Sequence, residues 1–198
     1  MSARVDLALI AGLVDEGARV LDIGCGNGDL LDLLVRERHA DARGLELKQA
    51  GVNACVGRGL SVVQGNADTD LTYYPDNGFD AVILSLTLQA TRRPHVVLRE
   101  MARIGTRLIV SIPNFGHWRI RRHLMLHGRM PTTHISDEHW YDTANIHLCT
   151  LRDFTELCAA LDLNVAQCIT LRGKKVHPHA SRFDNLFAEL AVFVLKGL

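Results

Sequence analysis

The stretch Val20–Leu30 constrains the fold of this chain more than any other. It reads V-L-D-I-G-C-G-N-G-D-L: an apolar strand containing Asp22, three alternating glycines (Gly24, Gly26, Gly28) and the start of an amphipathic helix. Glycines allow a backbone to approach a ligand closely, and a helix N-terminus offers free N–H groups. The stretch therefore predicts a nucleotide-type binding loop at the end of a first strand in an α/β fold.

The glycine spacing narrows the class of ligand. It is G-x-G-x-G and not the dinucleotide pattern G-x-G-x-x-G, and Asp22 stands two residues before the first glycine. A carboxylate there would repel a pyrophosphate but suits a ligand with an ammonium or sulfonium charge. S-adenosylmethionine (SAM) is such a ligand, and a plain strand-to-helix turn is the alternative.

Apolar periodicity alternates between strand and helix through the first part of the chain. The expected helices are Val5–Asp15, Asp29–His39, Gln49–Val56 and Pro94–Arg103. The expected strands are Arg19–Ile23, Ala42–Leu45, Leu60–Gln64, Phe79–Ser85 and Arg107–Ile112. This alternation indicates βαβ units and a doubly wound, mostly parallel sheet.

The rhythm changes near the C-terminus. There we expect a helix over Leu151–Leu161 and strands over Asn164–Leu171 and Leu186–Leu195, which form an antiparallel edge. The connection Arg172–Asn185 is expected to be a mobile loop. No linker rich in Pro, Gly or Ser interrupts the sequence, so we expect a single domain over residues 1–198, with an irregular cap at 113–150.

Composition bounds the function classes. Among the 198 residues, 22 basic side chains balance 22 acidic ones, which does not favour a nucleic-acid or anionic-membrane partner. The five cysteines form no C-x-x-C pair, as expected for free thiols in a reducing compartment. No apolar run approaches the roughly 20 residues of a membrane span, and no signal-peptide pattern opens the chain, so the expected location is cytoplasmic.

Polar residues mark three further strand ends. Glu46 closes the second strand, where an acidic residue takes a ribose diol. The turn Asn66-Ala67-Asp68 closes the third, where side-chain and backbone groups can pair with adenine, and Ser85 closes the fourth near the first loop. Each alone is an ordinary turn or surface residue. Together, at successive strand ends, they indicate an adenosyl ligand.

That combination resembles the class I SAM-dependent methyltransferase fold, over Val5–Ile112 and again in the closing strands. The resemblance implies that SAM or S-adenosylhomocysteine is the cofactor. Its methionine part would be held by Asp22, Gly24, Cys25, Gly26 and Gly28, its ribose by Glu46, and its adenine by Asn66, Ala67 and Asp68. Many such proteins have Asp where this chain has Asn66, which accepts a hydrogen bond without carrying charge.

Three longer segments are more family-specific. L-S-L-T-L-Q-A-T-R-R-P (84–94), S-I-P-N-F-G-H-W-R (111–119) and W-Y-D-T-A-N-I-H-L-C-T (140–150) are similar to the methionine biosynthesis protein MetW family. The similarity covers nearly the whole chain. It implies a protein that works with, or activates, homoserine O-acyltransferase; it leaves open whether the protein also transfers a methyl group.

The cap has three interpretations. As an acceptor pocket it would use His117, His147 or Tyr141 as catalytic groups, because a neutral imidazole takes a proton near pH 7. As a partner surface it would use Trp118, Trp140 and Tyr141 as anchors. As a plain cap it would only cover the sheet. The acceptor or partner residues considered are Asn114, His117, Trp118, Tyr141, Asp142, Asn145 and His147.

Other site classes find little support in the sequence. His123 and His127 share one helix face if that segment is helical, but no carboxylate or cysteine completes a metal set, so we predict no metal. The run 119–122, R-I-R-R, is typical of a solvated helix face or a docking patch for an acidic partner. Neither a G-x-S-x-G nucleophile elbow nor a G-x-x-x-x-G-K-[ST] phosphate loop is present.

Two functions remain from these patterns. The first is an accessory protein that binds SAM and supports homoserine O-acyltransferase, with SAM reporting the level of the end product. The second, the alternative, is an active SAM-dependent methyltransferase of a small molecule. The cap favours the first and the glycine loop favours the second.

Overall fold

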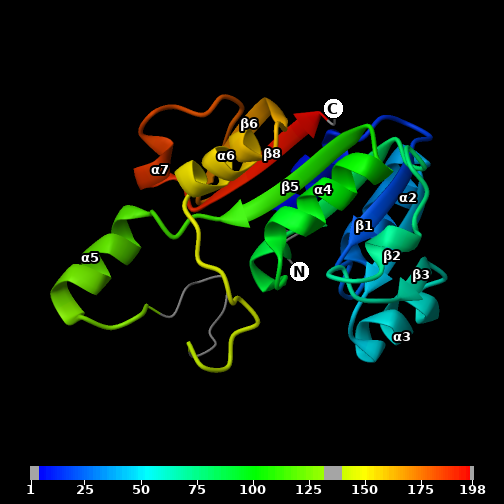
Figure 1. The fold of residues 1–198 in the computed structure, drawn as a ribbon, viewed down its shortest axis with the longest axis horizontal. Coiled ribbons are helices and arrows are strands. Elements are labelled where there is room, and N and C mark those ends of the chain that lie inside the picture. Colours follow the sequence, from blue (N-terminus) through cyan, green and yellow to red (C-terminus); the bar gives the residue numbers. More distant parts are fainter. Residues whose placement is uncertain (1–4, 132–139, 197–198) are drawn as a thin grey trace.

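The computed structural model describes residues 5–131 and 140–196 and builds them around one sheet (Figure 1). Its strands are β1 (Arg19–Ile23), β2 (Asp41–Glu46), β3 (Ser61–Gln64), β4 (Ala81–Ser85), β5 (Arg107–Pro113), β6 (Asn164–Arg172), β7 (Lys175–His177) and β8 (Leu190–Lys196). They lie in the order β3-β2-β1-β4-β5-β8-β6-β7. The first five pair in parallel, and the C-terminal three pair antiparallel, which confirms the predicted fold class and edge.

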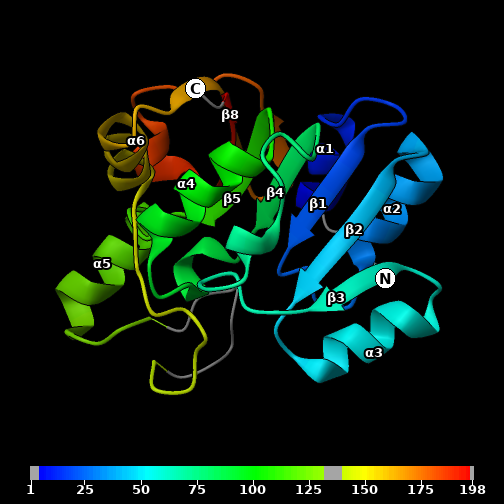
Figure 2. The same ribbon diagram turned by 45° about the vertical axis from the view of Figure 1, so that its right-hand side comes forward.

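Helices cover both faces of this sheet (Figure 2). They are α1 (Val5–Gly12), α2 (Asp29–Arg38), α3 (Gln49–Gly57), α4 (Pro94–Ile104), α5 (Trp118–His127), α6 (Leu151–Ala160) and α7 (Asp184–Phe187), with 3-10 turns η1 (Leu71–Tyr73) and η2 (Leu88–Ala90). One core joins the sheet to α4 and α6, and a second joins it to α1, α2 and α3. Because β1, β4 and β5 are buried on both faces, their sequences are largely apolar, with Asp22 in β1 and Ser111 in β5 as buried polar exceptions.

The strand order reverses between β1 and β4. The chain leaves β1 toward β2 on one side, and it later returns through β4 on the other side. In open parallel sheets a crevice forms beyond the carboxyl ends of the strands at such a point. This topology brings together the ends of β1, β2 and β4, which the sequence predicted to carry the site.

Two expected strands begin later in the structure than predicted. The expected strand Leu186–Leu195 is wrong at its start, because Asp184–Phe187 forms α7 and β8 begins at Leu190. The buried Asp184 carboxylate explains the helix: it accepts from Ser181 N–H and from the Arg172 guanidinium, fixing the turn before α7. The expected strand over Phe79–Ser85 begins at Ala81, and Phe79 makes only an isolated bridge with Gly105.

The loop and the cap contain more regular structure than expected. The connection after Arg172 turns at once into β7, which pairs antiparallel with the end of β6. The cap includes the regular helix α5, which ends at Gly128 in the left-handed conformation. Residues 132–139 of the cap lie outside the described part of the chain.

Within residues 5–131 and 140–196, none of the helices combines the length and the apolar character that crossing a membrane requires.

The ring pair between α6 and β8 offers a test of the packing. Phe154 is 2% exposed, and its ring centroid lies 4.5 Å from that of Phe193. We expect Phe154→Ala to lower the free energy of unfolding by about 3–5 kcal/mol, since it leaves a cavity in the core. Urea titration measures the change. Val56→Ala, at a side chain that is 60% exposed, is the control and should cost less than about 0.5 kcal/mol; equal losses would contradict this account of the core.

Candidate functional site

Two adjoining cavities lie beyond the carboxyl ends of the parallel strands. The larger, about 490 Å³, is lined by Leu7, Asp22, Gly24, Cys25, Gly26, Asn27, Asp29, Leu30, Glu46, Lys48, Ala50, Gly51 and Ser85. The smaller, about 260 Å³, is lined by Ile23, Gly24, Leu45, Glu46, Leu47, Lys48, Gly65, Asn66, Ala67, Asp68, Thr87, Ala90, Thr91 and Ala144. Gly24, Glu46 and Lys48 line both cavities, so the two lie side by side and share one wall.

The glycine loop is held tightly at the end of β1. Gly24 N–H donates to the Leu45 carbonyl at 2.7 Å, which joins the loop to β2. Gly24 has φ +73°, and a Cβ atom there would lie 2.5 Å from Thr87 Cγ2. Glycine is therefore required at this position both by the backbone conformation and by the close approach of the loop after β4.

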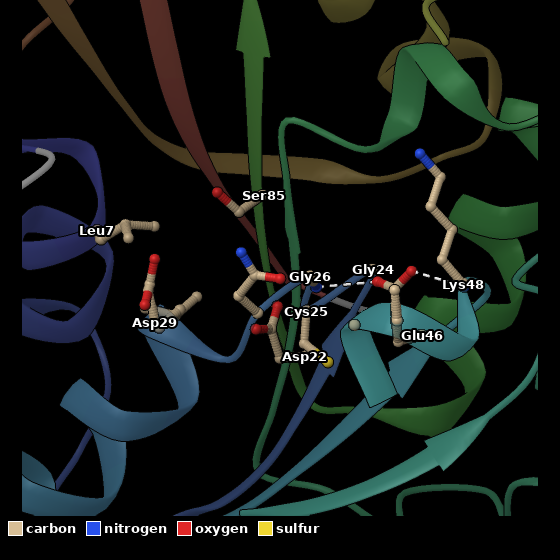
Figure 3. Close-up of a pocket in the computed structure, with 13 residues that line it drawn as sticks. Leu7, Asp22, Gly24, Cys25, Gly26, Asp29, Glu46, Lys48 and Ser85 are labelled. Carbon is tan, nitrogen blue, oxygen red and sulfur yellow. Dashed lines mark hydrogen bonds between the residues drawn. The ribbon is translucent and has the colours of Figure 1, made fainter. Parts of the chain in front are cut away.

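Glu46 joins the loop to the second strand (Figure 3). Its side chain is 8% exposed; one carboxylate oxygen accepts from Gly26 N–H at 2.9 Å and the other from Lys48 N–H at 2.8 Å. A carboxylate has about four acceptor positions, so each oxygen keeps capacity for another donor. Gly51 lets α3 approach this group, since a Cβ atom there would lie 2.8 Å from Glu46 Cγ.

The larger cavity carries an excess of negative charge. Asp22 is 1% exposed and lies in its wall together with Glu46 and Asp29, of which Asp29 is paired with Arg58 at 2.7 Å. Among the described residues, Lys48 is the cationic side chain of this wall. In Figure 3, Leu7 and Asp29 lie on one side, Glu46 and Lys48 on the other, and the glycine loop lies between them. This charge distribution favours a ligand whose charged end is positive.

The smaller cavity is a more apolar slot with a fixed polar rim. Asn66 Oδ1 accepts from Asp68 N–H at 2.9 Å, which closes an Asx turn after β3. The Asp68 carboxylate accepts from the backbone N–H groups of Arg92 and Arg93, each at 3.0 Å. Asp68 thereby ties the turn after β3 to the segment that follows β4.

The first part of the cap lies away from both cavities. Asn114 is buried; its Nδ2 donates to the Ala188 carbonyl at 2.8 Å, and its Oδ1 accepts from Gly116 N–H at 2.9 Å. His117 is the N-cap of α5, and its Nδ1 accepts from Arg119 N–H. Burial lowers the pKa of His117 and so favours the neutral imidazole, whose Nδ1 can accept the N-cap hydrogen bond.

The second part of the cap, residues 140–150, contacts the segment beside the smaller cavity through backbone groups. Ala144 lines the smaller cavity, and the N–H groups of Ile146 and His147 both donate to the Gln89 carbonyl, at 2.9 and 3.0 Å. His147 Nε2 also lies 3.4 Å from the Arg92 carbonyl. The side chains of the other predicted cap residues lie outside the walls of both cavities: Trp118 and Asn145 are half-buried, and Tyr141, Asp142 and His147 are exposed.

The structure thus places every predicted cofactor residue except Gly28 in the wall of one or both cavities. Gly28 is instead the N-cap residue of α2, with φ +80°. Sequence reasoning missed other lining residues. Lys48 and Gly51 lie two and five positions after Glu46, and the glycine inside the short helix α3 was the available signal. Leu7 and Ala144 come from distant parts of the chain, and nothing local in the sequence marks them.

The pairs His123/His127 and Cys25/Cys55 do not have the arrangement of a metal site or a disulfide. The rings of His123 and His127 stack with centroids 4.6 Å apart, and no cluster of three His, Cys, Asp or Glu among the described residues has the arrangement of a metal site. Cys25 and Cys55 lie 4.0 Å apart between their sulfur atoms and are free thiols. Burial raises the pKa of both thiols, which lowers their reactivity.

The fold and the site together define a class. The parallel sheet with an antiparallel C-terminal edge and a crevice at the ends of β1, β2 and β4 is that of class I SAM-dependent methyltransferases. A SAM-dependent methyltransferase of Thermotoga maritima has this fold: its TM-score is 0.72 at 17% identity, over 98% of this chain and 88% of that one. The family model of the methionine biosynthesis protein MetW matches residues 4–195, so the chain belongs to the MetW family.

Two curated relatives extend the comparison. The bifunctional methionine biosynthesis protein MetXA/MetW of Rhodopirellula baltica is 32% identical over 205 residues, which cover 97% of this chain and 32% of that protein. A fatty-acid O-methyltransferase of Mycolicibacterium smegmatis is 43% identical over 94 residues, which cover 45% of this chain and 34% of that protein. The match spans about one third of the length of either relative.

The glycine loop yields a prediction about stability. Gly24→Ala should lower the free energy of unfolding by at least about 1–2 kcal/mol, because alanine is strained at positive φ and would also collide with Thr87. Gly57→Ala is the matched control: a Cβ atom at Gly57 meets nothing within 4 Å, so the change should be neutral or slightly stabilising. Thermal and urea unfolding measure both. Equal effects would show that the loop is not constrained as described.

The N-cap of α5 yields a prediction about pH. Because the folded protein lowers the pKa of His117 below its ordinary value of 6.5, the unfolded chain binds a proton more readily. The contribution of His117 is therefore complete above pH 6.5 and is lost as the pH falls below it. His117→Asn keeps a capping acceptor but does not titrate, so its stability should fall less than that of the wild type between pH 7.5 and 5.5. Parallel profiles would contradict this role.

Proposed function

We propose that this chain is a SAM-binding accessory protein that docks on a homoserine O-acyltransferase and supports its activity. The observation that carries the proposal is the make-up of the two cavities. They hold the groups expected for an adenosyl ligand, whereas none of the predicted proton acceptors, His117, His147 or Tyr141, lines either of them. The site is suited to binding more than to acid–base chemistry.

The residues present fit SAM. The carboxylates of the larger cavity suit the cationic methionine part of the ligand, and the glycine loop with Asp22 would hold it. Glu46 has acceptor capacity on both oxygens for a ribose diol, and the slot beside Ala67 has the apolar walls that a purine requires. When bound, SAM would supply an activated methyl group.

The family and one relative support this choice of partner. The resemblance of this chain to the MetW family implies work with homoserine O-acyltransferase. The MetXA/MetW relative is named for two units in one chain, which is about three times as long as the matched part. Fusion in one organism supports association of separate chains in another.

The contacts around Gln89 support a regulatory role for SAM. Asp68, at the adenine end of the site, holds the backbone of Arg92 and Arg93, while the carbonyl groups of Gln89 and Arg92 lie against Ile146 and His147 of the cap. A ligand that orders the turn after β3 would therefore also order the exposed cap. Coupling of this kind typically amounts to about 1–3 kcal/mol, a shift of about 5- to 150-fold in affinity.

Methyl transfer is the second candidate. The local identity of 43% to a fatty-acid O-methyltransferase favours it, since that relative is named as an enzyme. With a good nucleophile, the reaction depends mainly on alignment and does not need a base in the wall. It predicts S-adenosylhomocysteine formation that depends on an added acceptor; a screen of cell-extract metabolites without any such product would count against it.

The direct test measures the rate of the acyltransferase from the same organism, with and without this protein, while SAM is titrated. We expect the rate to rise with the protein and to vary with SAM. Glu46→Ala should weaken SAM binding at least tenfold by calorimetry, because it removes charged hydrogen bonds worth about 1.5–3 kcal/mol. Glu37→Ala, at an exposed position of α2, is the control.

Three outcomes separate the claims. A flat rate at every SAM concentration, in the presence of an otherwise activating protein, overturns the regulatory role and leaves docking in place. No effect of the protein at all moves methyl transfer into first place. Unchanged SAM affinity in Glu46→Ala overturns the assignment of the ribose site.

A further inference from the structure

Helix α5 stands away from the sheet in both views (Figures 1 and 2). None of its ten residues is buried, although it carries Leu124, Met125 and Leu126 in succession. Met125 is 77% exposed and Leu126 65% exposed. A helix of this length gains most of its stability from packing an apolar face, and α5 packs no such face against the described part of the chain.

The charge of this segment is entirely positive. Residues 118–130 contain Arg119, Arg121, Arg122 and Arg129 and no Asp or Glu. Arg119 lies 3.8 Å from Glu189, and none of the ion pairs between described residues involves the other three. Arg119 and Arg122 flank the ring of Trp118, at 5.6 and 4.9 Å from its centroid, which holds the N-terminal turn in place.

We propose that α5, with the following residues to Met130, is the surface that docks on the acyltransferase, and that it fits an apolar patch with an acidic rim on that enzyme. Met and Arg are among the residue types enriched at protein interfaces, and this segment exposes Met125 and Met130 beside its arginines. Neighbouring exposed apolar side chains, here Leu124, Met125 and Leu126, are a feature of interaction sites. The inference rests on the proposed function and identifies the part of the chain that carries it.

The charge distribution selects this occupant over a second copy of the chain. A symmetric contact between two α5 helices would place arginine against arginine with no carboxylate in the segment to compensate, and like charges in contact are unfavourable. One relative contains MetXA and MetW in a single chain, so its MetW unit is always next to another protein unit. This favours a protein over a membrane as the partner of α5.

The test compares binding of the purified acyltransferase to full-length variants. Leu126→Glu and Arg122→Glu should each weaken binding at least tenfold, because one puts a charge into the apolar contact and the other reverses a charge at its rim. The matched controls are Val56→Glu, at an equally exposed apolar position of α3, and Arg99→Glu, at an exposed arginine of α4; both should bind within twofold of the wild type. SAM affinity, measured in parallel, should be unchanged in all four variants, which shows that the fold and the cavities are intact.

The outcomes distinguish this inference from the proposed function. If the wild type binds and the α5 variants bind equally well, the surface is wrong and the accessory role stands. If the wild type does not bind the acyltransferase, the proposed function fails and this inference fails with it. Flotation with phosphatidylglycerol vesicles is the second measurement: vesicle binding lost in Leu126→Glu, with acyltransferase binding retained, would assign α5 to a membrane and overturn the proposal.

Discussion

The arrangement of the site depends on the carboxylate of Glu46. It stands at the end of β2, is nearly buried, and accepts hydrogen bonds from the backbone of Gly26 on one side and of Lys48 on the other. These bonds, together with that between Gly24 N–H and the Leu45 carbonyl, hold the glycine loop against the second strand. The two cavities meet at this point, since Glu46 lines both. Because Glu46 holds the loop and can still accept further hydrogen bonds, the site at the ends of β1 and β2 is preformed. Binding a ligand there therefore costs little conformational entropy in the loop.

From this point, contacts lead outward to the surface. The turn after β3 is joined through Asp68 to the backbone of Arg92 and Arg93, and the neighbouring Gln89 carbonyl holds Ile146 and His147. The cap is therefore joined to the smaller cavity through the backbone, although its side chains are largely exposed. With this arrangement, a ligand bound in the smaller cavity can make the cap segment around Ile146 and His147 more ordered. This is the physical basis for the accessory role proposed above, which does not require that chemistry take place in the cavity.

The sequence was sufficient for the sheet and for the strand ends, because both depend on local patterns. Alternating apolar runs determine βαβ units, and Asp22, Glu46 and the Asn66-Ala67-Asp68 turn were placed correctly at successive strand ends. What could not be predicted depends on tertiary contacts. Leu7 and Ala144 reach the cavities only because α1 and the cap fold back over them. The apolar residues before Leu190 read as strand, but the buried Asp184 with Arg172 makes them a helix. The carbonyl groups that Asn114 contacts are 70 or more residues away in sequence.

The most direct measurement is amide hydrogen exchange of the whole chain with and without SAM. The account predicts slower exchange at Gly26 and Lys48, whose N–H groups bond to Glu46, and also at Ile146 and His147, whose N–H groups bond to the Gln89 carbonyl. Protection at both places would show that the adenosyl site and the cap respond together. Protection at the glycine loop alone would contradict the coupling between them, and unchanged exchange throughout at saturating SAM would contradict the site itself.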